Sequence, residues 1–269
     1  MQLVSGDPHP LLRPYVTSYQ GYRDASSVIQ RDVHAAFPGA PLIISFVPDP
    51  MITEPADGGS DPESHSSFVA GLHDTFSAGT WQGEQYGLQV NFTPVGAYLF
   101  LGLPMQEITN RIVEFGDLLG PDGDRLVEQL ASTPEWTDRF AAVDAFVGGR
   151  IANARRRPAP GVVWSWRRIT ETGGRVTVSE LATELGFSRK HLTTLFREQV
   201  GLPPKTVARI VRFDRASRAL GDGKAWTDIA DEAGYYDQAH LIRDFRQFSG
   251  FTPGEYAQRR SPEGGISGD

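Results

Sequence analysis

Two short stretches near the end of the chain carry side chains that can hydrogen-bond to the edges of nucleic-acid bases. Arg and Gln can each bond two atoms of a base edge in the major groove, and Thr, Ala or Ile can contact a thymine methyl group. The first set is Arg189, Lys190, Thr193, Thr194 and Arg197, and the second is Gln238, Ala239, Ile242, Arg243 and Arg246. Arg197 and Arg246 stand one helical turn further on, where a contact to phosphate is better placed. These residue types predict a surface that binds double-stranded DNA.

Each set belongs to one copy of an internal repeat within residues 178–256. Segment 179–187 pairs with segment 227–235 at an offset of 48, and the pairs that follow the turn have an offset of 49. The inserted residue is Tyr236, which lies in the turn, where an insertion is best tolerated. An ordinary solvated helix face would explain either copy alone, but two copies at near-constant spacing favour a shared function.

Start and stop residues predict two helices in each copy. Helix starts are expected at four N-cap residues, namely Ser179 and Ser188 in the first copy and Thr227 and Asp237 in the second. Gly186 and Gly234 would end the first helix of each copy in the left-handed conformation. The second helices would bury Leu192, Leu195, Phe196 and Val200, and Leu241, Phe245 and Phe248. A short helix, a tight turn and a second helix form the DNA-binding helix-turn-helix, whose predicted contact set also includes Ser188, Asp237 and His240.

A long helix over residues 204–220 is expected to hold the two units at a fixed separation. It is lined with Arg209, Arg212, Arg215 and Arg218. A solvated face, or intramolecular pairs with Asp214, would explain these arginines as well as DNA contacts do.

At these residues the sequence resembles a known family. Residues 234–246 read GYYDQAHLIRDFR and are followed by Gly250-Phe-Thr-Pro253 and Tyr256, which resembles the signature of the AraC/XylS family of bacterial regulators. The resemblance spans residues 162–260. It implies an all-α module of seven helices with two helix-turn-helix units, and regulation of promoters, often as an activator that contacts RNA polymerase. Ile242 departs from the family, which more often has a small polar residue there.

The amino-terminal part predicts a second domain, so the fold class is α+β and multidomain. Residues 10–93 are β-rich, apart from an expected surface loop at 49–66, and residues 95–153 are helical. Segments such as Thr93-Pro-Val-Gly-Ala97 resemble a domain that precedes the DNA-binding module in actinobacterial-type regulators. That resemblance implies a small cupin-like β-barrel followed by helices, with a role in effector sensing, dimerisation or both. The expected organisation is a sensor domain over 1–153, a linker over 154–161, the DNA-binding domain over 162–260 and a flexible tail over 261–269.

Composition narrows the functional classes. The net charge is −7 overall, but residues 161–260 carry +4 and residues 1–160 carry −9. The absence of cysteine excludes disulfides, thiolate metal sites and alkyl transfer to a cysteine. No apolar run approaches the ~20 residues of a membrane span, and the start lacks the pattern of a signal peptide, so a cytoplasmic protein is expected.

Two other functions stay open at this point: a metal-dependent cupin-like enzyme, and a partner-binding scaffold or dimer that uses helices in 121–153. The candidate metal ligands are His9, His34, His65 and His73. Their spacings match no metal motif, so we expect no metal, cofactor or catalytic residue. For an effector pocket the sequence offers Tyr15, Tyr19, Tyr22, Phe37, Phe46, Trp81, Tyr86 and Phe92, although aromatic residues in strands are more often core. The sequence does not identify the effector.

Overall fold

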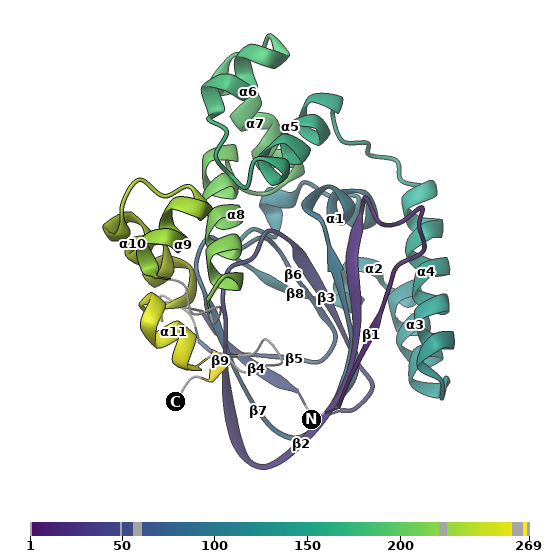
Figure 1. Cartoon of the computed structure of the whole chain (residues 1–269). Coiled ribbons are helices and arrows are strands. Elements are labelled where there is room, and N and C mark those ends of the chain that lie inside the picture. Colours follow the sequence, from purple (N-terminus) through teal and green to yellow (C-terminus); the bar gives the residue numbers. More distant parts are fainter. Residues whose placement is uncertain (1, 49, 56–60, 221–224, 260–265, 268–269) are drawn as a thin grey trace.

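A strongly curved antiparallel sheet and a set of helices make up the computed structural model of the chain (Figure 1). The structure describes residues 2–48, 50–55, 61–220, 225–259 and 266–267. Helices cover the outside of the sheet on one side, and the carboxyl-terminal helices lie across its opposite end (Figure 1). This arrangement confirms an amino-terminal antiparallel sheet region followed by a helical module.

The sheet is open. Its strands are β1 (Gln2–Gly6), β2 (Val16–His34), β3 (Ala40–Ser45), β4 (Met51–Pro55), β5 (Glu63–His65), β6 (Phe68–Ala70), β7 (Ser77–Phe92), β8 (Ile112–Glu114) and β9 (Ile266–Ser267). The main path runs β1-β2-β7-β3-β6-β8, and β4, β5 and β9 attach beside it. Among the described strands nothing pairs β1 with β8, so the sheet does not close into the small cupin-like β-barrel that the resemblance implies.

Two smaller predictions also change. The expected loop over 49–66 contains β4 and β5, because β4 pairs with β7 and these backbone hydrogen bonds outweigh the turn-forming composition. Of the expected tail over 261–269, residues 261–265 and 268–269 lie outside the described residues. Residues Ile266–Ser267 form β9, which pairs with β2.

The outer face of the sheet is covered by α3 (Pro121–Ser132) and α4 (Trp136–Ala152). Close packing requires glycine beneath the aromatic rings of α4. A Cβ on Gly21 would come within 2.3 Å of the Trp136 ring, and one on Gly6 within 2.6 Å of the Phe140 ring. The sheet and α4 are therefore pressed together too closely for any side chain at these two positions.

Seven helices follow in the described carboxyl-terminal part of the chain. They are α5 (Pro160–Glu171), α6 (Val178–Leu185), α7 (Arg189–Gln199), α8 (Pro204–Arg218), α9 (Trp226–Ala233), α10 (Gln238–Ser249) and α11 (Pro253–Arg259). The amino-terminal part contributes α1 (Pro94–Leu101), η1 (Met105–Glu107) and α2 (Phe115–Leu119). Among the described helices, none combines the length and apolar character needed to cross a lipid bilayer.

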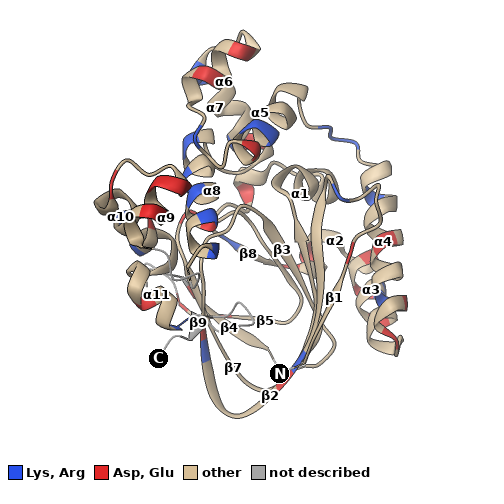
Figure 2. Ribbon diagram, viewed as in Figure 1, with Lys and Arg blue, Asp and Glu red and all other residues tan. Residues whose placement is uncertain are grey.

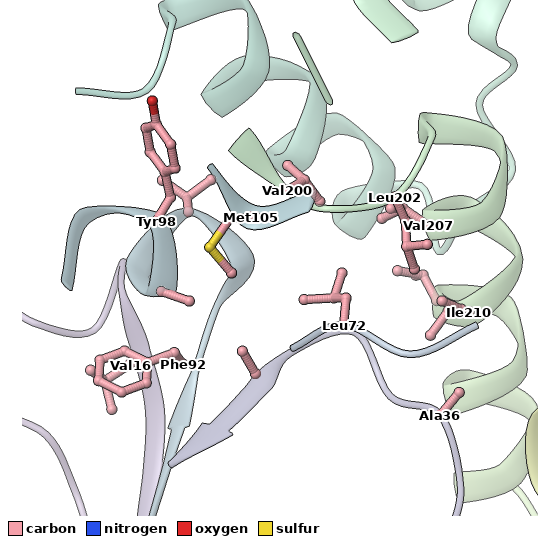
Figure 3. Packing of buried hydrophobic residues seen from close by; sticks show 14 of the residues in the cluster. Val16, Ala36, Leu72, Phe92, Tyr98, Met105, Val200, Leu202, Val207 and Ile210 are labelled. Carbon is pink, nitrogen blue, oxygen red and sulfur yellow. The ribbon is translucent and has the colours of Figure 1, made fainter. Parts of the chain in front are cut away.

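One continuous apolar core joins the sheet region to the helical module (Figure 3). Leu72 and Met105 of the first part are fully buried in the same cluster as Val207 and Ile210 of α8. The hydroxyl of Thr109 also donates to the carbonyl of Gly201, at 3.0 Å. The two parts are thus packed against each other.

Candidate nucleic-acid interface and ligand cavity

The helix pair α6 and α7 has well-defined ends. The Thr177 side chain accepts from the Glu180 N–H, and the Glu180 carboxylate accepts from the Thr177 N–H, which forms a capping box. The prediction of Ser179 as the N-cap is therefore wrong, because this residue lies in the first turn of α6. Gly186 ends α6 with φ +67°, and Ser188 caps α7 by accepting from His191 N–H at 3.1 Å, both as predicted.

The second pair, α9 and α10, repeats this arrangement from its turn onward. Helix α9 starts after Ala225, which has no side-chain cap, so the predicted N-cap Thr227 is also wrong. Gly234 ends α9 with φ +84°, and the Asp237 carboxylate accepts from His240 N–H at 2.7 Å. Both turns thus set the direction of the helix that follows.

The predicted DNA-contacting side chains of α7 and α10 lie at the surface. The exposed ones are Ser188, Arg189, Lys190, Thr194, Arg197, Asp237, Gln238, Ala239, Arg243 and Arg246, and the half-buried ones are Thr193, His240 and Ile242. The hydroxyls of Thr193 and Thr194 donate to the carbonyls of Arg189 and Lys190 in their own helix. Their hydroxyls are therefore satisfied, which suits methyl contacts better than polar contacts.

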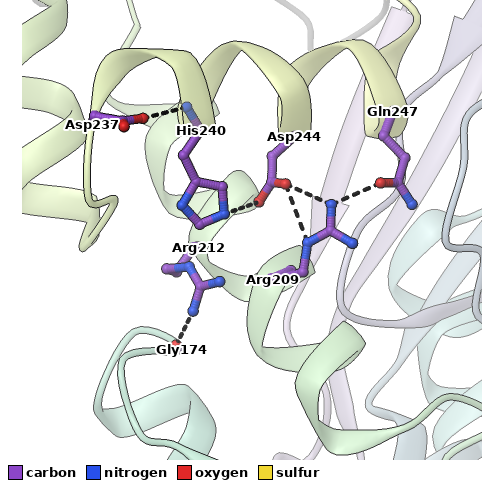
Figure 4. A network of polar contacts seen from close by, with 7 residues as sticks. All are labelled: Gly174, Arg209, Arg212, Asp237, His240, Asp244 and Gln247. Atoms are coloured by element: carbon purple, nitrogen blue, oxygen red, sulfur yellow. Dashed lines mark hydrogen bonds and ion pairs between the residues drawn. The ribbon is translucent and has the colours of Figure 1, made fainter.

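Helix α8 lies between the two helix pairs and carries a line of basic residues (Figures 1 and 2). Two of its arginines bind inside the protein (Figure 4). Arg209 donates to Asp244 Oδ1 at 2.6 and 3.2 Å and to Gln247 Oε1 at 2.7 Å, which fastens α10 to α8. Arg212 donates to the Gly174 carbonyl, and Arg218 pairs with Asp214. Intramolecular contacts therefore account for Arg209 and Arg212, whereas Arg218 stays exposed beside its partner on α8.

A second feature is a cavity of about 590 Å³ on the inner face of the curved sheet, of a size typical for small-molecule sites. Alternate residues of β2 and their partners on β7 line it. The facing pairs are Gln20 with Gln89, Asp24 with Gln85, Gln30 with Trp81, and His34 with Ser77. Phe213, Asp214 and Ser217 of α8 and Tyr256 of α11 also line it, so both parts of the chain form its wall.

Two of the four predicted histidines meet in this cavity. The His34 side chain is accessible because it faces the cavity, but the surrounding protein desolvates it and lowers its pKa below 6.5, and the pKa of His73 is shifted in the same direction by burial. His65 lies elsewhere, with Nδ1 3.0 Å from Glu114, and His9 accepts from Leu11 N–H. In the described part of the chain, no group of three or more His, Asp or Glu side chains could hold a metal ion.

The aromatic candidates divide between core and cavity. Tyr22, Phe37 and Trp81 line the cavity. The others pack elsewhere: Tyr19 and Phe92 are core residues, Tyr15 packs against the core, and Phe46 and Tyr86 lie against Trp136 on the outer face.

The polar residues of the cavity are not among the side chains predicted from the sequence. Gln20, Asp24, Gln30 and Asp32 face the cavity where a simple core would have apolar side chains. Their alternation along residues 20–34 is the signal that could have revealed them.

The end of α10 is hydrogen-bonded directly to the rim of the cavity. The Ala36 N–H donates to the Phe248 carbonyl at 2.8 Å. Gln247 Nε2 donates to the Asp74 carbonyl at 3.0 Å, and the Thr75 hydroxyl donates to the Gln247 carbonyl at 3.3 Å. Ala36 and Thr75 also line the cavity, so the same segments contact both sites.

Comparison with known proteins identifies the helical module. Residues 181–259 match the family model described as a helix-turn-helix domain, and residues 6–114 match a domain of unknown function. A Streptomyces antibioticus regulator described as AraC-like is 32% identical over 87 residues, covering 32% of this chain and 29% of the relative. Residues 181–259 are thus a helix-turn-helix domain, and the chain is similar over part of its length to an AraC-like regulator.

The curated relatives are matched over only part of their length. The F1 operon positive regulatory protein of Yersinia pestis is 32% identical over 82 residues, covering 30% of this chain and 27% of the relative. The HTH-type transcriptional regulator YtdP of Bacillus subtilis is 28% identical over 91 residues, covering 34% of this chain and only 12% of the relative. The chain therefore spans less than a third of the length of these relatives.

A whole-chain likeness appears at the level of fold. The crystal structure of unsaturated fatty acid bound wild-type ToxT from Vibrio cholerae has a TM-score of 0.53 and 8% sequence identity, covering 94% of this chain and 96% of that chain. An amino-terminal sheet region joined to a carboxyl-terminal helical module is thus an arrangement that this chain shares with a solved protein.

Proposed function

We propose that this chain is a sequence-specific DNA-binding transcription regulator. The observation that carries the proposal is the pair of capped helices α7 and α10, each with an exposed face of base-binding side chains. In this proposal, α6 with α7 and α9 with α10 are two helix-turn-helix units, and α8 spaces them. The DNA-contacting residues are the exposed and half-buried side chains of α7 and α10 named for the interface, together with the caps Ser188 and Asp237.

The proposal retains the domain organisation expected from the sequence. Residues 1–153 act as the sensor and dimerisation domain, 154–161 as linker and 162–260 as the DNA-binding domain. Promoter DNA is the partner, and contact with RNA polymerase and pairing of two copies are expected from the family. This function would place the chain in the cytoplasm and requires no catalysis or cofactor.

We propose further that a small molecule in the cavity controls DNA binding. The cavity supports this because its wall includes α8 and α11 of the DNA-binding module, and its rim holds the end of α10. The solved structure of ToxT has an unsaturated fatty acid bound to that protein. In this chain the cavity of about 590 Å³ is large enough to hold a small-molecule effector.

Selection of bound sequences from a random DNA pool, with the full chain, tests the proposal. We expect enrichment of one motif spanning about two helical turns, because each recognition helix would contact one major-groove segment. The variant Arg189→Ala with Arg243→Ala should lose that preference. Arg125→Ala on α3 removes a charge far from these faces and should leave it unchanged. Recovery of no motif would reject the proposal.

A further inference from the structure

The charged side chains that line the cavity are all acidic. Three carboxylates line it, from Asp24 and Asp32 on β2 and from Asp214 on α8, which is already paired with Arg218. Its described lining includes no Lys or Arg side chain. His34 and His73 do not offset the carboxylates at neutral pH, because burial keeps both imidazoles neutral. An anion placed here would lose its hydration without gaining a cationic partner, whereas a cation would gain carboxylate partners.

Two further side chains give this wall defined polar groups. Gln85 lines the cavity and is 9% exposed. Its amide Nε2 is buried and has no hydrogen-bond partner within the described structure. A buried donor without a partner is unfavourable, so a ligand acceptor would stabilise it. The indole N–H of Trp81 donates to Asp32 Oδ2 at 2.7 Å, which fixes this carboxylate beside an aromatic ring.

Aromatic rings complete the wall. Tyr22, Phe37, Phe68 and Trp81 line the cavity and add apolar area to its wall. Ring faces attract organic cations through their quadrupole, most strongly where water is excluded. The same surface accepts an apolar ligand body, so charge and shape favour one class of molecule.

We propose that the effector is an organic cation, an amine or quaternary ammonium with an aromatic or apolar body and a hydrogen-bond acceptor. Its charged head lies by Asp32, and its acceptor takes the Gln85 amide. The inference rests on the proposed role of the cavity as an effector site and adds the ligand class. It differs from the fatty acid named for ToxT, which is an anion.

Three probes with one body and different heads test the ligand class by calorimetry on the full chain. They are benzoylcholine (a cation), its neutral isostere 3,3-dimethylbutyl benzoate, and the anion 4-(benzoyloxy)butanoate. We expect the cation to bind at least tenfold more tightly than the neutral ester, about 1.4 kcal/mol, and the anion to bind most weakly. Equal or tighter binding of the neutral ester or the anion would overturn the assignment, as would no binding of any probe.

Variants separate the two contacts. Asp32→Asn should reduce the preference for the cation to less than threefold and leave the neutral ester unaffected. Gln85→Leu should weaken all three probes alike, because all share the ester carbonyl. The control Glu128→Gln removes one exposed carboxylate from α3 and should change nothing. A cation preference that survives Asp32→Asn would contradict the placement of the head.

The DNA assay distinguishes failure of this inference from failure of the proposed function. Site selection with the unliganded chain reports on α7 and α10 alone. A chain that enriches a DNA motif but prefers the anion refutes only the ligand class. A chain that binds the cation but enriches no motif refutes the DNA-binding function.

Discussion

Breaking the buried ion pair between Arg209 and Asp244 should strongly destabilise the contact between α8 and α10. The Asp244 side chain is 1% exposed and receives two hydrogen bonds from Arg209, whose guanidinium also lies 5.0 Å from the Phe248 ring centroid. Removing one partner of a buried pair costs about 3–5 kcal/mol, because the other charge stays buried alone. The Arg209 side chain is 25% exposed, so water can partly solvate the freed guanidinium. For Asp244→Leu we therefore expect a loss near the low end, about 3 kcal/mol.

Urea unfolding of the full chain, followed by helical circular dichroism at equal protein concentration, measures this loss. The double variant Arg209→Met with Asp244→Leu is the informative control. Replacing both charges with apolar side chains of similar volume should recover most of the stability, since buried pairs gain little over hydrophobic contacts. A loss below about 1 kcal/mol for Asp244→Leu, or a double variant as unstable as the sum of both single variants, would refute the reasoning.

Four further outcomes are expected. Arg243→Ala should lose about 1–3 kcal/mol of DNA-binding free energy and relax the preference at one base position, measured by fluorescence anisotropy on single-base variants of the selected site. Arg197→Ala should weaken all sequences alike and reduce the slope of log affinity against log salt by about 1, and a loss confined to one sequence would contradict a phosphate contact. Gln247→Ala should speed hydrogen exchange at the end of α10 roughly fivefold, from loss of about 1 kcal/mol, with α7 unchanged as the internal control. The free energy of unfolding should fall as the pH drops below 6.5. In the folded protein His34 and His73 have lowered pKa values and stay neutral, whereas in the unfolded chain they bind protons. The double variant His34→Gln with His73→Gln should reduce the dependence of the unfolding free energy on pH.

The helix pairs were predictable because their signals are local. The caps Ser188 and Asp237 and the left-handed glycines Gly186 and Gly234 act within a few residues of the chain. The start of α6 was misplaced by two residues because Ser179 looks like a cap. The spacing of Thr177 and Glu180 as a capping box is the stronger signal.

The sheet was less predictable because strand pairing depends on distant partners. Residues 51–55 have the composition of a loop, yet Ile52 pairs with Thr80, and the β7 backbone supplies their hydrogen bonds. Closure into a barrel would require β1 to pair with β8, the strand at the opposite edge of the sheet. No local pattern reports on that contact, so the expectation of a closed barrel came only from resemblance.

The candidate cavity was hidden for a different reason. Aromatic residues drew attention, but a ring serves a core and a ligand wall equally well, and only Tyr22, Phe37 and Trp81 of the candidates line the cavity. Polar side chains at alternate strand positions discriminate better, since a core does not tolerate them without partners. Asp24 and Gln85 face each other across β2 and β7, an arrangement that appears only once the register is known.

The placement of the cavity also favours control of one helix pair over the other. Ala36 and Thr75 each follow a cavity histidine by two residues, and both hydrogen-bond to the end of α10. A ligand that displaces the backbone at either histidine would shift the segments that hold α10. The first pair is held elsewhere, where Thr109 donates to the Gly201 carbonyl. If the proposed function holds, occupation of the cavity should alter the contacts of α10 with DNA and leave those of α7 unchanged. The protein would then gain or lose the DNA segment bound by α10 while it stays bound to the segment contacted by α7.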